Sequence, residues 1–245
     1  MTPPPDLDTS STLAPTGRAA LAEGVGSFFL LATVVGSGIA ATRLSPGALG
    51  LELLENALAT GAVLGTLILT FAPLSGAHFN PLVTILQWTR GRLERERIGP
   101  YLFAQFIGAA LGTVTANLMF AHPAITFSTT SRFGGHLWLG ELVATLGLLL
   151  VVVGTERHST LAGALAVGGY ITGAYFFTSS TSFANPAVTV ARTLSRSFAG
   201  IAPGSVTGFV VAQGAGLLVA LGLLRLLGDA RLTPAHSPAS TKGLP

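Results

Sequence analysis

Six long apolar segments constrain this chain more than any other feature. They cover residues 19–41, 55–75, 101–120, 137–155, 160–178 and 205–227. Each is close to the length of about 20 residues that a helix needs to cross a bilayer. Only 9% of the 245 residues are charged, whereas soluble domains carry about 25%. The sequence therefore predicts an all-α membrane protein with six transmembrane helices.

The two ends of the chain differ from these segments. Residues 1–17 are rich in Pro, Ser and Thr and lack the basic region of a signal peptide. We expect them, and residues 229–245, to be disordered tails around one membrane domain at residues 18–228. No cysteine is present, which excludes disulfides and thiolate metal sites. The net charge of +3 comes from scattered arginines, so nucleic acid is not an expected partner.

The membrane domain contains an internal repeat, with repeat one at about 18–120 and repeat two at about 136–228. The segment AHFNPLVTI in the first half matches SFANPAVTV in the second. Glu23 matches Glu141, and Gln105 matches Gln213, at similar offsets. Three spans per half is an odd number, so the second half must be inverted in the membrane.

Two Asn-Pro pairs, Asn80-Pro81 and Asn185-Pro186, each begin an apolar stretch too short to cross a bilayer. Asn is a favoured helix N-cap, and Pro suits the first helical position. We therefore expect two re-entrant half-helices whose N-termini meet near the middle of the membrane. Each N-terminus carries about half a positive charge, so the facing ends oppose cations. The asparagine amides would donate hydrogen bonds to a passing oxygen.

These residues resemble the aquaporin and aquaglyceroporin family, the major intrinsic proteins. The resemblance covers about residues 18–228 and rests on the two glutamates, SGAHFNPLVT, YLFAQFIGA and FANPAVT. It implies an aquaporin-like inverted 3+3 repeat, a homotetramer with one pore per subunit, and passive conduction. Selectivity by pore diameter, lining donors and half-helix dipoles is a known property of such pores. No enzymatic activity and no cofactor are expected.

Two departures from the family motifs affect the pore. The first motif ends in Leu82, where the family usually has alanine, and we expect Leu82 to reshape the lining near the middle of the membrane. The second motif ends in Ala187 and is followed by Val188, where the family usually has an arginine that narrows the outer constriction.

The other constriction positions follow from a gap-free count back from the two asparagines. The count gives Thr60, Gly173 and Ser182, which are all small. With Val188 they predict a wide, weakly polar opening. The count is least secure in the fifth span, where a shift of register would bring Tyr170 or Tyr175 to the pore instead.

A wide constriction with valine in place of arginine resembles a bacterial branch of the family that is associated with arsenic resistance. This resemblance rests on FANPAVTVARTLS. It implies passage of undissociated trivalent or methylated arsenicals beside glycerol-like polyols and water. Two alternatives stay open. A proton- or ion-coupled secondary transporter would use Glu23 or Glu141 as its proton site, and a water-only aquaporin would need bulky groups at the constriction.

Several polar residues lie near these motifs. A buried carboxylate must be hydrogen-bonded to be tolerated. We therefore favour a structural role for the two glutamates, as acceptors of backbone N–H bonds from the half-helix loops, with both glutamines in the same networks. His78 is expected to line the vestibule, although a pH gate is conceivable. Arg192 lies about two turns beyond the second asparagine, so we expect it near the outer vestibule. There it could partly replace the missing charge or simply be solvated, and we favour solvation. The histidines show no metal-ligand spacing.

The arginines indicate the orientation in the membrane. Four of them, Arg90, Arg92, Arg95 and Arg97, follow the first half-helix. Loops rich in Lys and Arg stay in the cytoplasm. We therefore expect a multi-pass protein of the inner (plasma) membrane with both termini in the cytoplasm.

Overall fold

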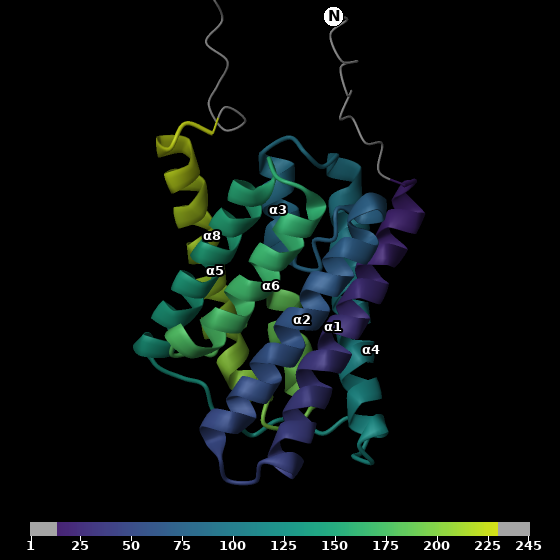
Figure 1. The fold of residues 1–245 in the computed structure, drawn as a ribbon, viewed down its shortest axis with the longest axis vertical. Coiled ribbons are helices and arrows are strands. Elements are labelled where there is room, and N and C mark those ends of the chain that lie inside the picture. The colour runs from purple at the N-terminus through teal and green to yellow at the C-terminus, as the bar shows by residue number, and fades with distance from the viewer. Residues whose placement is uncertain (1–13, 230–245) are drawn as a thin grey trace, which may run out of the picture.

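A computed structural model describes residues 14–229 of the chain. Its six long helices are α1 (Thr16–Leu44), α2 (Leu49–Ser75), α4 (Arg95–Met119), α5 (Gly135–Thr155), α6 (Thr160–Phe177) and α8 (Val206–Leu226), as Figure 1 shows. Two short helices, α3 (Pro81–Thr89) and α7 (Pro186–Ala191), are the predicted half-helices. The 3₁₀ turns η1 (Arg192–Leu194) and η2 (Pro203–Ser205) follow α7. The predicted arrangement of six spans and two half-helices is confirmed.

The predicted tails fall mostly on residues that the structure does not describe, 1–13 and 230–245. Within the described part, α1 already begins at Thr16, two residues inside the first predicted tail.

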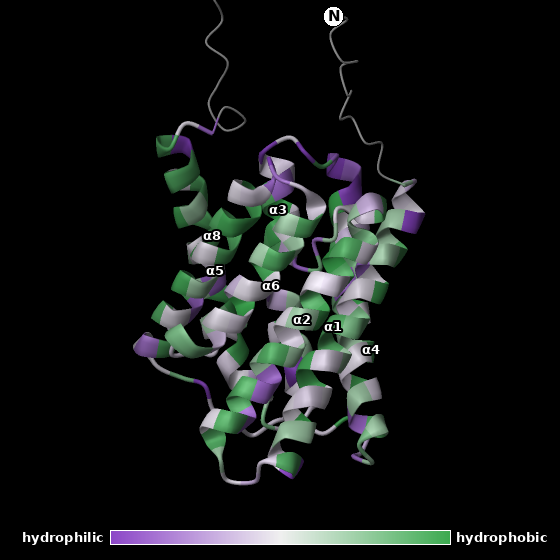
Figure 2. Cartoon of the chain, viewed as in Figure 1, coloured by the Kyte–Doolittle hydropathy of each residue, from purple (hydrophilic) through white to green (hydrophobic). Residues whose placement is uncertain are grey.

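The outer surface of the long helices is apolar. Leu21, Phe103 and Leu218, on three different helices, expose 67%, 71% and 70% of their surface. In Figure 2, hydrophilic residues gather toward the two ends of the molecule, and the sides are mainly hydrophobic. All six long helices are long and apolar enough to cross a membrane. Contact with lipid or with neighbouring subunits is favourable for such a surface, whereas contact with water is not.

The two halves of the chain pack in the same way. In the first half α1 lies against α2 and α4, and in the second half α5 lies against α6 and α8. The contact of α2 with α6 joins the halves. α1 begins and α8 ends at the same face, which we call the terminal face, whereas α5 begins toward the opposite face (Figure 1). The second half is therefore inverted, as predicted.

Glycines allow close approach at two of these crossings. A Cβ atom on Gly108 of α4 would lie 2.0 Å from the carbonyl oxygen of Gly24 on α1. A Cβ atom on Gly61 of α2 would lie 2.6 Å from the carbonyl oxygen of Gly168 on α6. Neither crossing has room for a methyl group, which is typical of tightly packed transmembrane helices.

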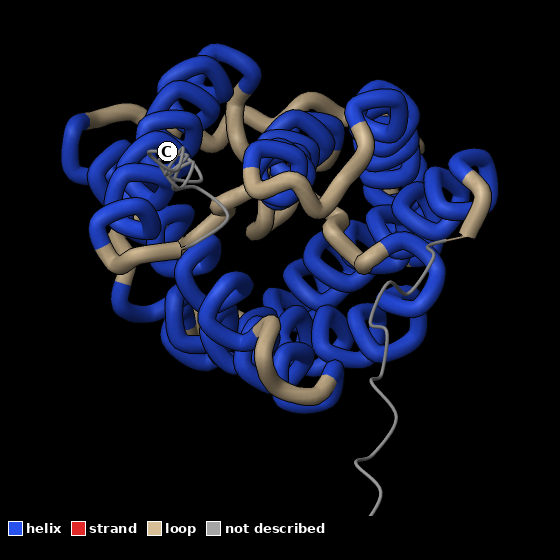
Figure 3. The backbone as a smooth tube through the Cα atoms, turned by 90° about the horizontal axis from the view of Figure 1, so that it is seen from above, coloured by secondary structure: helices blue, strands red, loops and turns tan. Residues whose placement is uncertain are grey.

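The half-helices lie inside this frame. α3 contacts α4 and α8, α7 contacts α4 and α8, and α3 also contacts α7. Figure 3 shows loops that turn inward between the long helices. Each half-helix is thus held by both repeats, and the two meet in the interior of the molecule.

Candidate functional site

The loop before each half-helix has an unusual backbone. Ala77 and Phe79 have φ values of 51° and 48°, and the matching Ser182 and Ala184 have 50° and 48°. Residues other than glycine seldom adopt this left-handed conformation, which costs about 1–3 kcal/mol each. The conformation persists because it turns backbone N–H groups toward a buried carboxylate.

Glu23 holds the first loop. Its Oε1 accepts hydrogen bonds from the His78 N–H at 2.9 Å and the Ser75 hydroxyl at 2.6 Å. Its Oε2 accepts from the Phe79 N–H at 2.6 Å and the Gln105 amide at 2.8 Å. The side chain is fully buried and does not line the cavity described below.

Glu141 holds the second loop in the same manner. It accepts from the N–H groups of Phe183 and Ala184 at 2.8 and 2.9 Å, and from the Gln213 amide at 2.6 Å. Gln213 also donates to the Thr189 hydroxyl at 2.8 Å. The prediction that each glutamate accepts N–H bonds from its loop, with a glutamine in each network, is confirmed.

Asparagine caps start both half-helices. The Asn80 Oδ1 accepts from the Leu82 N–H at 2.9 Å. The Asn185 Oδ1 accepts from the N–H groups of Ala187 and Val188 at 2.9 and 3.2 Å. The adjacent prolines, Pro81 and Pro186, occupy the first helical position, where the missing N–H would have had no intrahelical partner.

The same two asparagines join the half-helices to each other. The Asn80 Nδ2 donates to the Ala184 carbonyl, and the Asn185 Nδ2 donates to the Phe79 carbonyl, both at 2.8 Å. Each amide nitrogen carries two hydrogens, so one N–H per asparagine is left for a solute. Both asparagines line the cavity. The sequence predicted donors at this junction but not the reciprocal bonds that aim them.

A cavity of about 260 Å³ extends past both asparagines. Toward the terminal face its lining includes Gln87, Thr155, Glu156, His158 and Ser159. On the other side of the junction the lining includes Thr60, Tyr175, Ser182, Val188 and Arg192. Between these ends, apolar side chains cover much of the wall, among them Leu30, Val34, Leu64, Leu148, Val167 and Ile171.

Three of the four predicted constriction residues, Thr60, Ser182 and Val188, line this cavity. The prediction for Gly173 is wrong, because Gly173 lies exposed on the outer side of α6 and a Cβ there would meet nothing within 4 Å. Tyr175 lines the cavity in its place, and its hydroxyl donates to the Thr60 hydroxyl at 3.2 Å. Two residues along a helix correspond to a rotation of about 200°, which explains the exchange.

The other tyrosine of α6 turns away from the cavity. The Tyr170 hydroxyl donates to the Ala144 carbonyl on α5 at 3.0 Å. The aromatic side chain at Tyr175 makes this part of the cavity narrower and more polar than four small residues would.

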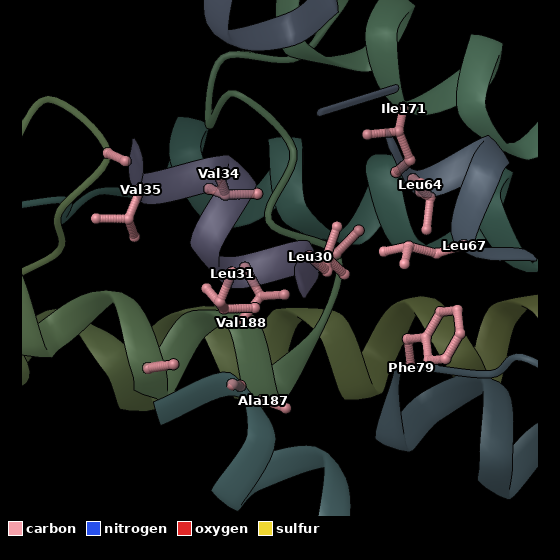
Figure 4. Close-up of a cluster of buried hydrophobic side chains, with 14 of the residues drawn as sticks. Leu30, Leu31, Val34, Val35, Leu64, Leu67, Phe79, Ile171, Ala187 and Val188 are labelled. Carbon is pink, nitrogen blue, oxygen red and sulfur yellow. The ribbon is translucent and has the colours of Figure 1, made fainter. Parts of the chain in front are cut away.

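Val188 belongs to an apolar part of the wall. It lies in one buried cluster with Leu30, Leu31 and Val34 of α1, as Figure 4 shows. The expectation for Leu82 is wrong, because Leu82 packs with Leu149 and Leu217 in a separate cluster and does not line the cavity.

His78 lines the cavity, as expected. Its Nδ1 lies 3.1 Å from the Thr84 hydroxyl, and its ring packs edge-on against Tyr101 with centroids 5.5 Å apart.

The prediction that Arg192 is solvated is wrong, because the residue is buried, with only 2% of its surface exposed. Its Nε donates to the Ala199 carbonyl, and its guanidinium carbon lies 3.4 Å from the centroid of the Phe183 ring. Counting residues along the half-helix could not reveal this, because the chain after η1 folds back over Arg192.

An ion-pair cluster at the terminal face was also missed by the sequence reasoning. The Arg90 Nη1 lies 2.5 Å from the Glu156 carboxylate, and the Arg90 Nε lies 2.7 Å from the Asp229 carboxylate. Arg92 approaches Glu156 at 3.1 Å. These contacts tie the end of α3 to the ends of α5 and α8, beside the cavity.

Comparisons with known proteins agree with this geometry. The family model described as major intrinsic protein matches residues 10–161. Aquaglyceroporin AqpS of Rhizobium meliloti is 46% identical over 210 residues, which cover 86% of this chain and 90% of that protein. Probable aquaporin AqpM of Archaeoglobus fulgidus is 32% identical over 208 residues, which cover 74% and 84% of the two chains.

A solved structure, the aquaglyceroporin from Plasmodium falciparum, superposes with a TM-score of 0.68 at 22% identity. The match covers 89% of this chain and 99% of that one. This likeness concerns the fold.

Proposed function

The chain belongs to the major intrinsic protein family, and we propose that it is a passive channel for small uncharged solutes. Proteins of this family are membrane channels and not enzymes. The observation that carries the proposal is a cavity that passes both half-helix tips, with one unused amide N–H from each of Asn80 and Asn185 on its wall.

The lining suits glycerol-like polyols beside water. Hydroxyl and amide groups of Thr60, Asn80 and Asn185 offer hydrogen bonds, while Val34 and Leu64 provide apolar wall. A polyol has hydroxyl groups and C–H groups to place against these two kinds of surface. A few polar groups in a mostly apolar pocket are the usual design of a site for small molecules.

Undissociated trivalent or methylated arsenicals belong to the same proposed class of solute. Arsenous acid at neutral pH is uncharged and carries three hydroxyl groups, so it presents the same donors and acceptors as a small polyol. Val188 supports this extension, because it places an apolar group where a fixed arginine charge would narrow the path.

The structure gives little support to a coupled transporter. Glu23 and Glu141 do not line the cavity, and each carboxylate already accepts three or more hydrogen bonds. A proton site must exchange protons with the transport path, and these groups are committed to holding the loops. A water-only pore would need bulky groups at the constriction. Tyr175 is one such group, but Thr60, Ser182 and Val188 beside it are small, which favours a pore that also admits larger solutes.

The family and the apolar outer surface support a proposal for the location and the assembly of the channel. We place the channel in the inner (plasma) membrane with the terminal face, and so both termini, in the cytoplasm. A homotetramer would cover part of the apolar outer surface that Leu21 and Phe103 illustrate.

Flux measurements in proteoliposomes test the proposal. Glycerol and arsenous acid uptake should rise linearly with the imposed gradient and should be unaffected when a protonophore collapses the proton gradient. Sucrose, as a size control, should stay outside. Saturable uptake that the protonophore abolishes would support the coupled transporter instead.

A further inference from the structure

Val188 carries no charge, but a positively charged residue, Arg192, lies one helical turn further along the chain. Arg192 is four residues beyond Val188, so the two side chains lie on the same face of the α7–η1 segment. Both line the cavity, together with Tyr175 and Thr60.

The Arg192 guanidinium is held in place by two contacts. Its Nε donates to the Ala199 carbonyl, and its planar group lies over the Phe183 ring. That ring is itself fixed edge-on against Phe209, with centroids 5.1 Å apart. Because a guanidinium has five donors in a rigid fork, anchoring Nε sets the direction of the two Nη groups.

The two Nη groups are directed to the cavity. In the part of the chain that the structure describes, neither makes a hydrogen bond to protein, and neither is among the buried polar atoms that lack a partner. They are therefore open to the cavity that the side chain lines. The ion pairs within residues 14–229 involve Arg90, Arg92 and Arg97, and none involves Arg192. The positive charge is thus not neutralised by an ion pair.

A second arginine, Arg132, also lies over the Phe183 ring and serves as a comparison for Arg192. The guanidinium carbon of Arg132 lies 5.1 Å from the centroid of Phe183, and its Nε donates to the Gly200 carbonyl at 2.9 Å. Arg132 does not line the cavity. Both guanidinium groups lie over the same ring, but only that of Arg192 belongs to the wall of the cavity.

We propose that Arg192 is the charge-selecting residue of this pore: its guanidinium excludes cations in the half toward the opposite face and donates hydrogen bonds to the oxygens of uncharged solutes. The proposal rests on the function proposed above and names the residue that sets its specificity. The guanidinium adds a full positive charge to the barrier that the facing half-helix N-termini already present to cations, and a fixed charge in a low-dielectric pore acts strongly at short range.

Potassium permeability of proteoliposomes tests this proposal. Arg192→Met should raise K⁺ permeability on the order of tenfold or more, whereas Arg192→Lys, which keeps the charge, should exclude K⁺ as the wild type does. Arg132→Met is the matched control and should also exclude K⁺. Exclusion by a folded Arg192→Met that still conducts water would overturn the proposal, and so would an equal leak through Arg132→Met.

A second measurement keeps Arg192 intact and so does not depend on the folding of its variants. The chain has no cysteine, so Val188→Cys introduces a single thiol one turn from the guanidinium. The anionic sulfonatoethyl methanethiosulfonate should modify this thiol at least about tenfold faster than the cationic trimethylammonium reagent, after correction for their rates with a free thiol. Equal rates, a faster cationic reagent, or no reaction with either would overturn the proposal.

Neither the K⁺ permeability nor the rate of thiol modification depends on glycerol transport. A wild type that conducts water but no glycerol would refute the proposed solute class, while the K⁺ and thiol data would still decide the role of Arg192.

Discussion

Glu23 and Glu141 show how single residues maintain this pore without touching a solute. Each carboxylate gathers N–H groups from a loop whose left-handed residues are individually unfavourable. A neutral amide cannot replace them, because its NH₂ group would face N–H donors. The intramembrane charge is therefore a structural requirement of the re-entrant loops.

Glu23→Gln should destabilise the protein by about 3 kcal/mol or more, because it removes charged acceptors and leaves buried donors unpaired. Thermal unfolding in detergent, followed by circular dichroism, measures the loss, and Glu141→Gln should behave alike. A Glu23→Gln protein as stable as the wild type, with solute uptake altered, would instead indicate a proton-coupling site.

At the scale of elements, two half-helices of nine and six residues are stabilised by their caps and by each other. Helices this short are not stable alone. The asparagine side chains accept at the caps and donate across the junction, so each cap depends on the opposite loop being in place.

This mutual dependence predicts strong coupling between the caps. Asn80→Ala and Asn185→Ala should each cost about 1–2 kcal/mol from the lost cap alone. The double variant should deviate from additivity by about 0.5–3 kcal/mol, because the first change already disturbs the junction. Unfolding free energies in mixed micelles give the cycle. Ser159→Ala, which removes the cap of α6 at a distance from the junction, should add to Asn80→Ala without coupling.

The crossing of α1 and α4 offers a second prediction at this scale. Gly108→Ala places a methyl group 2.0 Å from a carbonyl of α1, so the helices must separate and the yield of folded protein should fall severely. Gly99→Ala, on the same helix with nothing within 4 Å, should fold normally, since alanine favours the helix. Gel filtration compares the two, and equal profiles would show that the crossing is looser than described.

At the scale of the whole molecule, the sequence predicted the fold well because the evidence for it was repeated. Two Asn-Pro motifs, two glutamates and two glutamines recur in the same order, and each pair occupies matching places in the structure. The pore lining was harder to predict. Gly173 was assigned by counting along a helix, where an error of two residues turns a side chain from the cavity to lipid. Leu82 was misplaced because its neighbours Leu149 and Leu217 come from segments distant in the chain. Arg192 was misplaced because the segment after η1 folds back over it and brings the Ala199 carbonyl to its guanidinium.

The tetramer is expected from the resemblance to the family, and the apolar outer surface leaves room for contacts between subunits. We expect the detergent-solubilised protein to have four times the mass of the single chain, because a tetramer covers part of the side that faces neither cavity nor solvent. Light scattering coupled to gel filtration measures this mass. A monomer in several mild detergents would show that lipid alone covers the surface.

If uncharged solutes pass through this cavity beside Val188, a change at that position must alter glycerol uptake by proteoliposomes. Val188→Arg is compared with Val188→Leu, which adds a carbon atom but no charge, and water flow in each sample confirms a folded pore. Val188→Arg should slow glycerol uptake by about tenfold or more, equivalent to about 1.4 kcal/mol in the barrier, while Val188→Leu should have a smaller effect. Unchanged glycerol uptake through a water-conducting Val188→Arg protein would contradict the claim.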